Sequence, residues 1–312
     1  MRDEIVILGI FVADTAYRAE RMPVLGESIL GQGFKLGPGG KGSNQAISAA
    51  RAGGKVRFIS RLGADTFADM ARATWADAGV TPDVTVDENS HTGAAFIFLE
   101  DASGDNAIIV AAGAAGRMTP AEIDARADSI AAARVFLTQL ETPIDVARHA
   151  LKLARAGGAT TILNPAPAAA LDRDMMALCD FVTPNETEAE ALTGIAVTDL
   201  DSARHAAAVL LEQGARAAII TLGAQGVLYH DRGRSVHVPA RRLGPVVETT
   251  GAGDAFNGAF ATALAEGADP VDAARFGCVA ASISVTRAGA GEAMAQRAEI
   301  EAALSEEERD QP

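Results

Sequence analysis

Short apolar segments alternate with longer segments of helical spacing along most of this chain. Runs typical of strands lie at 5–9, 55–62, 134–140, 160–163 and 217–222, and helical patterns lie between them at 43–53, 66–79, 143–158 and 202–214. Parallel strands need crossover connections of this length, usually helices that cover both faces of the sheet. The alternation therefore predicts an α/β fold with a doubly wound, mainly parallel sheet flanked by helices.

Two stretches break this alternation. Residues 11–34 hold several Gly and Pro residues and no convincing helix, and residues 91–112 contain two strand-like runs separated by a turn at 101–105. We expect one α/β domain over residues 1–312, with a small β-subdomain inserted at about 11–34 and 91–112. Such a subdomain could cover a site at the sheet edge, but surface hairpins without a role fit the pattern equally well.

Charge and composition exclude several classes of protein. The 312 residues carry 27 basic and 41 acidic side chains, a formal charge of −14, which argues against nucleic acid as a partner. No run of about 18 apolar residues is present, so we expect no membrane association. Only Cys179 and Cys278 occur, far apart, which argues against a disulfide framework or a zinc site. These features predict a cytoplasmic protein.

The segment Gly37-Pro-Gly-Gly-Lys-Gly42 matches the G-x-G-x-x-G pattern of dinucleotide-binding folds. In those folds the glycines follow the first strand directly, whereas here they come 27 residues after it. The segment also fails as a P-loop because Lys41 is followed by Gly42 rather than by Ser or Thr. Both nucleotide-loop interpretations are rejected, and an NAD-dependent oxidoreductase is kept only as the weakest hypothesis for function.

The segment Gly251-Ala252-Gly253-Asp254 is more informative. It follows a strand-like run at 246–250 and opens a helix expected over 255–266. Free backbone amides at a helix N-terminus favour an anion, and glycines let a phosphate approach closely. Asp254 either caps the helix or acts as a general base that takes a proton from a hydroxyl group beside this anion hole.

An acidic cluster lies at Thr183-Pro-Asn-Glu-Thr-Glu-Ala-Glu190. Asn185 and Glu188 have the spacing of a helix capping box, which is one interpretation. The other is that the two side chains steer Mg²⁺ and phosphate groups, through water where needed. The sequence leaves both open.

Several motifs taken together resemble the ribokinase-like (PfkB) carbohydrate kinase family. They are Gly39-Gly-Lys-Gly-Ser-Asn44-Gln-Ala, Gln139-Leu-Glu141, Asn164-Pro-Ala-Pro, the cluster at 183–190, Thr221-Leu-Gly and Thr250-Gly-Ala-Gly-Asp254-Ala-Phe-Asn-Gly258. Each is modest alone, but their order and spacing are specific, and the resemblance runs from Ile5 to about Gly291. It implies Mg²⁺-dependent transfer of the γ-phosphoryl group of ATP to a sugar hydroxyl group, with D-ribose and ribose 5-phosphate as the first candidates for substrate and product.

The resemblance also implies roles for individual residues. Asp254 matches the catalytic base, and Gly251, Ala252 and Gly253 match the anion hole. Sugar contacts match Asp14, Gly40, Asn44 and Glu141. Asn185 and Glu188 match the phosphate and Mg²⁺ region, and nucleotide contacts match Thr221, Gly223, Gly226 and Cys278. The β-subdomain looks like the family's lid, through which a homodimer is expected. Taken without the family, Asp14, Gly40, Asn44, Glu141, Thr221, Gly223 and Cys278 fit ordinary structural roles as well.

The sequence departs from the family pattern at three places. Val12 stands where members that act on ribose carry an asparagine, so a hydrogen bond to the sugar worth roughly 1–3 kcal/mol is missing. A possible K⁺ site matches Glu248, Thr250, Ser284, Arg287, Gly289 and Ala293, where Glu248 and Ala293 replace an aspartate and a serine. Cys278 replaces a histidine near the expected adenine pocket.

Two alternatives follow from these departures. The first is a kinase for another sugar or for a nucleoside, because of Val12. The second is a catalytically silent sugar or nucleotide sensor on the same fold. Loss of the base or of the anion hole would indicate a sensor, and neither is missing from the sequence.

Overall fold

The computed structural model describes residues 3–103 and 105–310, and the part described contains two β-sheets. The large sheet has the spatial order β13 (Ser235–Val238), β12 (Val227–Asp231), β11 (Ala217–Thr221), β10 (Phe181–Val182), β9 (Thr160–Leu163), β8 (Val135–Thr138), β1 (Glu4–Leu8), β4 (Lys55–Gly63) and β5 (Thr81–Asp87). The strands from β11 to β5 are parallel, and β12 and β13 are antiparallel additions at one edge. The predicted mainly parallel sheet is confirmed.

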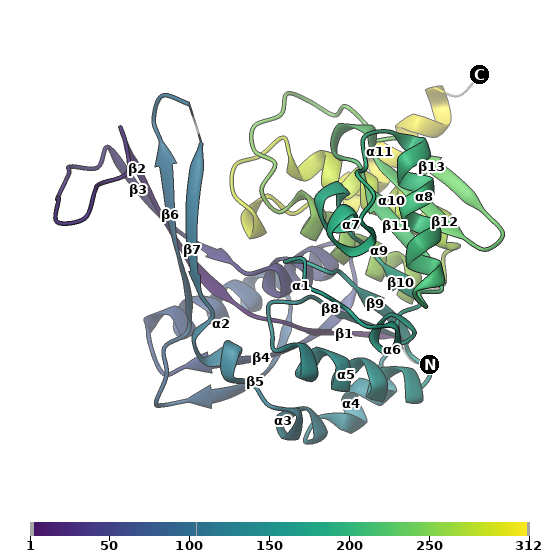
Figure 1. The fold of residues 1–312 in the computed structure, drawn as a ribbon, viewed down its shortest axis with the longest axis horizontal. Helices are drawn as coiled ribbons and strands as arrows, with labels where there is room; N and C mark the ends of the chain where they lie inside the picture. Colours follow the sequence, from purple (N-terminus) through teal and green to yellow (C-terminus); the bar gives the residue numbers. More distant parts are fainter. Residues whose placement is uncertain (1–2, 104, 311–312) are drawn as a thin grey trace.

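Helices cover both faces of this sheet, as the alternation predicted (Figure 1). One layer consists of α1 (Lys41–Arg51), α2 (Thr66–Ala78), α9 (Ala252–Ala265), α10 (Pro270–Ser284) and α11 (Arg297–Asp310). The other consists of α3 (Pro120–Asp124), α4 (Ala127–Ala132), α5 (Ile144–Ala156), α6 (Arg173–Met176), α7 (Glu186–Thr193) and α8 (Leu200–Glu212). Short 3₁₀ turns lie at Gly113–Arg117, Gly223–Gln225 and Gly291–Ala293.

Strand β1 explains why two helical layers are needed. Ile5 and Ile7 point into the core beneath the layer of α1 and α9, and Val6 and Leu8 point into the core beneath α5 and α8. Successive side chains of a strand point to opposite faces, so four consecutive apolar residues bury both sides of the sheet.

The small sheet has the order β3 (Gly33–Gly39), β2 (Val12–Ala19), β6 (Gly93–Glu100) and β7 (Asn106–Ala111). It projects from the body beside α1 and α2 (Figure 1), and we call it the lid sheet. The predicted β-subdomain is therefore present, but its first part runs to Gly39 rather than to residue 34. Gly37 and Gly39 belong to strand β3 and pair with Asp14 and Val12, so the glycine-rich pattern is not a loop in this region.

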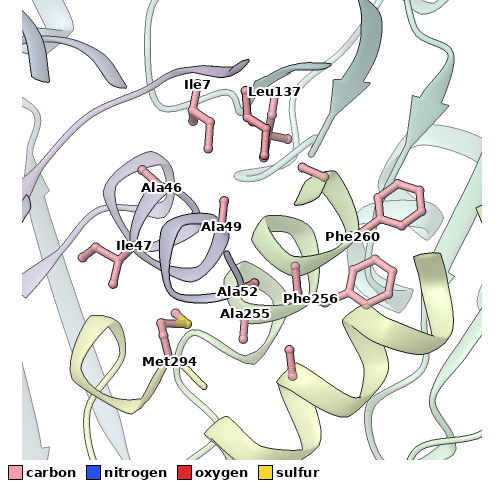
Figure 2. Close-up of a cluster of buried hydrophobic side chains, with 14 of the residues drawn as sticks. Ile7, Ala46, Ile47, Ala49, Ala52, Leu137, Ala255, Phe256, Phe260 and Met294 are labelled. Atoms are coloured by element: carbon pink, nitrogen blue, oxygen red, sulfur yellow. The ribbon is translucent and has the colours of Figure 1, made fainter. Parts of the chain in front are cut away.

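Helices α1 and α9 pack side by side at the centre of one core, to which Ala46, Ala49 and Ala255 all belong (Figure 2). Gly258 allows this approach, because a Cβ atom there would lie 2.4 Å from the Gln45 carbonyl oxygen. Ser48 Oγ also donates to the carbonyl of Ala255 at 2.8 Å. Small residues thus bring two segments 210 residues apart into contact.

One predicted element is wrong. Residues 246–250 were expected to form a strand, but they run as an extended segment without a partner strand in the described part of the chain. The amides of Val247 and Glu248 donate to the carbonyl of Val285 at the end of α10, at 2.8 and 3.3 Å. Val246 and Val247 are exposed, so their β-branched side chains are not explained by burial in a sheet.

Cys179 and Cys278 are both buried. Within the residues described, no helix has the length and apolar character needed to cross a bilayer.

Candidate active site

A cavity of about 140 Å³ lies at the carboxyl ends of β9, β10 and β11, where the first turn of α9 faces them. Parallel sheets of this kind bind ligands at the carboxyl ends of their strands. The cavity is lined by Lys41, Asn164, Ala166, Thr183, Asn185, Glu188, Thr221, Thr249, Gly251, Ala252, Gly253, Asp254 and Asn257. Segments spread over more than 200 residues therefore meet at one edge.

The N-terminus of α9 forms one wall of this cavity. Gly251 is the N-cap with φ of 78°, and it has no side chain to accept from the first-turn amides. The amide of Ala252 donates to the carbonyl of Thr249 at 3.2 Å, and a Cβ atom on Gly253 would meet only open space. The unfilled first turn, with the positive end of the helix dipole, suits a phosphate group.

Asp254 lies in that first turn and is only 7% exposed. Its Oδ1 accepts from Gln45 Nε2 at 2.9 Å, and its Oδ2 accepts from Asn44 Nδ2 at 3.1 Å. The carboxylate therefore does not act as a plain helix cap, because its hydrogen-bond donors Asn44 and Gln45 come from another helix, α1. Burial is the main influence and raises the pKa of Asp254, although hydrogen bonds and the charge of Lys41 oppose it. A carboxylate so held can accept a proton.

Lys41 brings a positive charge into the cavity and was not among the residues predicted for the site. Burial lowers the pKa of its ammonium group, but the charges of three carboxylates outweigh burial and raise it. These carboxylates are Asp254, Glu141 and Glu188. A lysine inside a glycine-rich segment is the signal that sequence reasoning had available, because such a lysine commonly contacts phosphate.

Glu141 lies next to Lys41, and its carboxylate is close enough to Asp254 and Asp14 to interact with their charges. Glu141 Oε2 accepts from the Lys41 amide at 2.8 Å. Burial raises the pKa of Glu141 to about 7 and that of Asp14 to about 6. Asp14 comes from the lid sheet, and a Cβ atom on Gly39 would lie 2.2 Å from its carboxylate. The lid sheet thus adds a carboxylate to a site that otherwise belongs to the body.

Gly40 and Asn44 open helix α1 beside these carboxylates. Gly40 is the N-cap with φ of 90°, and a Cβ atom there would lie 2.6 Å from the carbonyl of Ile10. Asn44 Oδ1 is buried and has no hydrogen-bond partner among the described residues. An unsatisfied buried acceptor of this kind is costly unless a ligand supplies a donor.

Asn185 and Glu188 form the predicted capping box at the start of α7. Asn185 Oδ1 accepts from the Glu188 amide at 2.8 Å, and Glu188 Oε2 accepts from the Asn185 amide at 2.9 Å. Both residues also line the cavity, so the structural and functional interpretations are compatible. Burial raises the pKa of Glu188.

The predicted nucleotide contacts are divided by the structure. Thr221 ends β11 and lines the cavity, whereas Gly223, Gly226 and Cys278 are not among its lining residues. Gly226 has φ of 96°, and a Cβ atom there would lie 2.1 Å from the Val238 carbonyl oxygen, so the turn requires glycine. Cys278 is a residue of α10 that is buried in the hydrophobic core, and its Sγ atom lies 4.0 Å from the same carbonyl oxygen.

The positions predicted for a monovalent cation lie in the segment before α9 and in the stretch from the end of α10 to the 3₁₀ turn at Gly291–Ala293. Glu248 Oε2 accepts from the Gly289 amide at 2.8 Å, and Arg287 forms an ion pair with Glu299. Ser284 Oγ donates to the carbonyl of Ala281 at 2.9 Å. Thr250 lies directly before the N-cap of α9. Among the described residues, no group of three or more His, Cys, Asp or Glu side chains could hold a metal ion by itself.

A doubly wound sheet with a carboxylate beside an open helix N-terminus defines a site suited to phosphoryl transfer onto a small molecule. The comparisons agree. Residues 2–297 match the model of the "pfkB family carbohydrate kinase". The chain is 39% identical to ribokinase of Haemophilus influenzae over 300 residues, which cover 96% of this chain and 97% of that protein. It is 36% identical to deoxyribokinase of Salmonella typhi over 288 residues, 92% and 94% of the two chains.

A solved structure agrees as well. The structure of Arabidopsis thaliana ribokinase complexed with ribose and ATP is similar with a TM-score of 0.92 and 30% identity, covering 97% of this chain and 99% of that one. The chain therefore belongs to the pfkB family of carbohydrate kinases, which confirms the resemblance seen in the sequence, and it is an ATP-dependent sugar kinase.

Proposed function

We propose that this kinase phosphorylates a pentose, with D-ribose as first substrate and ribose 5-phosphate as product. The observation that carries this proposal is the Asp254 carboxylate, held within the first turn of α9 where the anion-binding amides also lie. The ribokinase relatives and the ribose-bound neighbour support ribose as the acceptor.

In this mechanism Asp254 accepts the proton of the attacking sugar hydroxyl group. The hydroxyl oxygen forms a bond to the γ-phosphorus of ATP while the bond from that phosphorus to the β–γ bridging oxygen breaks. Backbone amides of 251–254 and the Lys41 ammonium group stabilise the negative charge on the transferring group. General base catalysis of this kind contributes roughly 10²–10⁴-fold.

The sugar lies between the lid sheet and the start of α1. Asp14 and Glu141 accept hydrogen bonds from its hydroxyl groups, and the unsatisfied Asn44 Oδ1 accepts another. Gly40 contributes its backbone to this pocket, and glycine is required there because any side chain would collide with the carbonyl of Ile10. These assignments use groups whose burial already favours a polar ligand over water.

ATP binds across the carboxyl ends of β10 and β11. Asn185 and Thr221 contact its phosphate region, and Gly223, Gly226 and Cys278 lie toward the nucleoside. The residues fit Mg²⁺: Glu188 Oε2 is held by the Asn185 amide, which leaves Oε1 for a metal-bound water. One carboxylate plus substrate phosphates is the usual Mg²⁺ environment in kinases. The ion, when bound, offsets the charge of the phosphates.

A monovalent cation requirement is kept as a secondary proposal. One oxygen of Glu248 is already used by the Gly289 amide, and Ala293 offers no side-chain oxygen. A site at these positions would depend on backbone carbonyls and on the second Glu248 oxygen. Turnover with K⁺ replaced by tetramethylammonium tests it, and equal rates would reject the site.

A second acceptor, 2-deoxyribose, is favoured by Val12. This residue is 3% exposed and lies two positions before Asp14, on the same face of β2. Its isopropyl group cannot bond a hydroxyl group of the sugar, and a sugar that lacks one hydroxyl group loses nothing there. The 36% identity to a deoxyribokinase supports the same acceptor.

The lid sheet also supports a homodimer. Register places Tyr17, Phe34, Leu36, Phe96 and Ile109 on one face, and all but Phe96 are among the exposed large apolar side chains. The opposite face carries Asp14 and packs on the body through Val12 and Ala95. An apolar face of this kind is typical of a contact between subunits, here a second copy of the chain. A cytoplasmic location is proposed with it, since the sequence carries only two cysteines, far apart along the chain.

The test is ADP release from ATP and Mg²⁺ with ribose, 2-deoxyribose, other pentoses, hexoses and nucleosides. Asp254→Asn should reduce turnover by about 10²–10⁴-fold. Asp272→Asn, an exposed change in α10, is the matched control and should leave turnover unchanged. A higher turnover with 2-deoxyribose than with ribose would show that 2-deoxyribose is the preferred acceptor. ATP binding without turnover on every compound would favour a sensor and reject the proposal.

A further inference from the structure

A chain of buried amide side chains is hydrogen-bonded to Asp254. It consists of Gln45 from α1, Gln139 after β8 and Asn164 after β9, exposed by 0%, 1% and 6%. Gln45 Nε2 donates to Asp254 Oδ1 at 2.9 Å and to Asn164 Oδ1 at 3.0 Å, and Gln45 Oε1 accepts from Gln139 Nε2. Neither glutamine lines the cavity.

A backbone carbonyl outside this chain of amides fixes which of their groups donate and which accept. Asn164 Nδ2 donates to the backbone carbonyl of Thr183 at 2.9 Å, so its Oδ1 must face Gln45. Gln45 must then present its NH₂ group to Asn164 and to Asp254. A flipped Gln45 would set its own oxygen against two acceptors, which a buried site does not tolerate. The position of a backbone carbonyl therefore decides which group faces the carboxylate.

The backbone of α1 is also held in place. Gly258 of α9 packs on the Gln45 carbonyl, and Gly42 packs on Gly9, where a Cβ atom would lie 2.6 Å from the Gly9 Cα atom. Gln45 thus reaches Asp254 from a helix with little room to move. Asn44 holds the other carboxylate oxygen and keeps its own buried Oδ1 without a partner among the described residues. Gln45 is fully buried and reaches the cavity through its hydrogen bonds to Asp254 and Asn164.

We propose that Gln45 is a positioning residue that sets the orientation of the Asp254 carboxylate and favours its ionised form. Asn164 and Gln139 keep the NH₂ group of Gln45 pointed at Oδ1. The inference rests on the proposed role of Asp254 as the base. Loss of the Gln45 donor leaves a buried carboxylate with fewer partners, so the base becomes protonated at a higher pH and rotates more freely.

The experiment is the pH dependence of kcat, with ATP and the best sugar both saturating, for the full-length enzyme and two variants. Gln45→Met keeps the length of the side chain and removes the donor. We expect kcat at pH 7 to fall about 10–100-fold and the acid-side midpoint to rise by about one pH unit. KM for ATP should stay within about twofold of the original value.

Gln45→Glu is the second variant and keeps the size and shape of the side chain. If Gln45→Met does not fold, Gln45→Glu is sufficient to test the proposal. Two carboxylates would face each other at the position of the 2.9 Å hydrogen bond, and such pairs share a proton. We expect a larger rise of the acid-side midpoint and a recovery of kcat toward high pH. The matched control is Gln213→Met, which removes a glutamine donor to the carbonyl of Leu192 far from the cavity.

An unchanged acid-side midpoint in the variants overturns the inference. A pH-independent loss of kcat that accompanies a lower Tm and a raised KM for ATP also overturns it, because it marks a purely structural role. Asp254→Asn is measured in parallel. Full activity in that variant would reject the proposed base itself, which separates the failure of this inference from the failure of the proposed function.

Discussion

Two regions supply groups to the same site, the α1–α9 contact and the lid sheet. They differ in how closely their side chains are packed. Between α1 and α9 the side chains are buried, and Gly258 leaves no space for a single added methyl group. In the lid sheet, Phe34 and Ile109 are more than half exposed, and Gly37 has open space around its Cα atom. Packing density therefore separates the two regions.

This difference in packing matches the different requirements of the two proposed site residues, Asp254 and Asp14. Asp254 needs a fixed position and a low-dielectric environment, and close packing of two helices provides both. Asp14 belongs to the proposed sugar site and comes from a sheet that contacts the body through Val12, Ala95 and the ion pair of Lys35 with Glu292. A weakly packed sheet can move aside to admit a ligand.

The largest effect should come from breaking the dense region. Gly258→Ala places a Cβ atom 2.4 Å from the Gln45 carbonyl oxygen and 2.5 Å from Ser48 Cβ. Helix α1 must shift, which should cost roughly 1–3 kcal/mol of stability and about 100-fold in kcat. Thermal unfolding and steady-state kinetics measure the two effects. Gly33→Ala in the lid sheet, where the nearest atom is 3.7 Å away, should change neither.

The next effect concerns the lid sheet as a sugar-binding element. Asp14→Asn removes a charged acceptor from the sugar and should raise KM for the sugar about 10–100-fold, with KM for ATP unchanged. Asp101→Asn, near the tip of the same sheet and paired with Arg18, is the control. An equal rise of both KM values would show that the lid sheet acts on the whole site rather than on the sugar.

A smaller effect on catalysis, but a clear one on assembly, should follow from the exposed face of the lid sheet. Ile109→Glu introduces a charge into that face and should yield a particle of one 32.0 kDa chain in light scattering. Ile108→Glu places the same charge on the opposite face of the same strand and should leave a dimer. A native enzyme with the mass of one chain would reject the proposed dimer.

The smallest effect should be on stability, through Glu141. Its pKa rises from 4.5 to about 7 in the fold because of burial, so the folded protein binds this proton more tightly than the unfolded chain does. Stability from this group is therefore greatest below about pH 4.5 and decreases as the pH rises toward 7. Glu141→Gln should raise Tm at pH 7.5 by roughly 2–4 °C and flatten this pH dependence. A lower Tm of the variant at pH 7.5 would contradict the assignment.

Several parts of the fold and site follow from local sequence. Apolar alternation predicted β1, β4, β9 and β11 within one or two residues, because buried strands leave a direct hydrophobic pattern. Gly251-Ala252-Gly253-Asp254 predicted an anion-binding helix start with an acid inside it. The strand predicted at 246–250 was wrong, because β-branched residues have strand propensity wherever they lie, and within residues 3–103 and 105–310 no strand pairs with them.

Other parts could not be reached in this way. The role of Gln45 depends on its distance from Asp254 across α1 and α9, and nothing in the spacing of the motif indicates that this side chain reaches the carboxylate. The extent of the lid sheet was underestimated because Gly37-Pro-Gly39 has the composition of a turn, while pairing with β2 extends it as a strand. Pairing between distant strands overrides local propensity.

The sequence by itself determined the fold class, the family and the identity of the proposed base, because each depends on residue type and order along the chain. Only the tertiary structure decided that Asp254 accepts from Asn44 and Gln45 rather than capping its own helix, and that Gly223, Gly226 and Cys278 lie away from the cavity walls. The physical reason is that hydrogen bonding and burial depend on which segments are in contact in the folded chain. Gly258 allows the contact of α9 with α1, where Ser48 lies 210 residues earlier in the sequence.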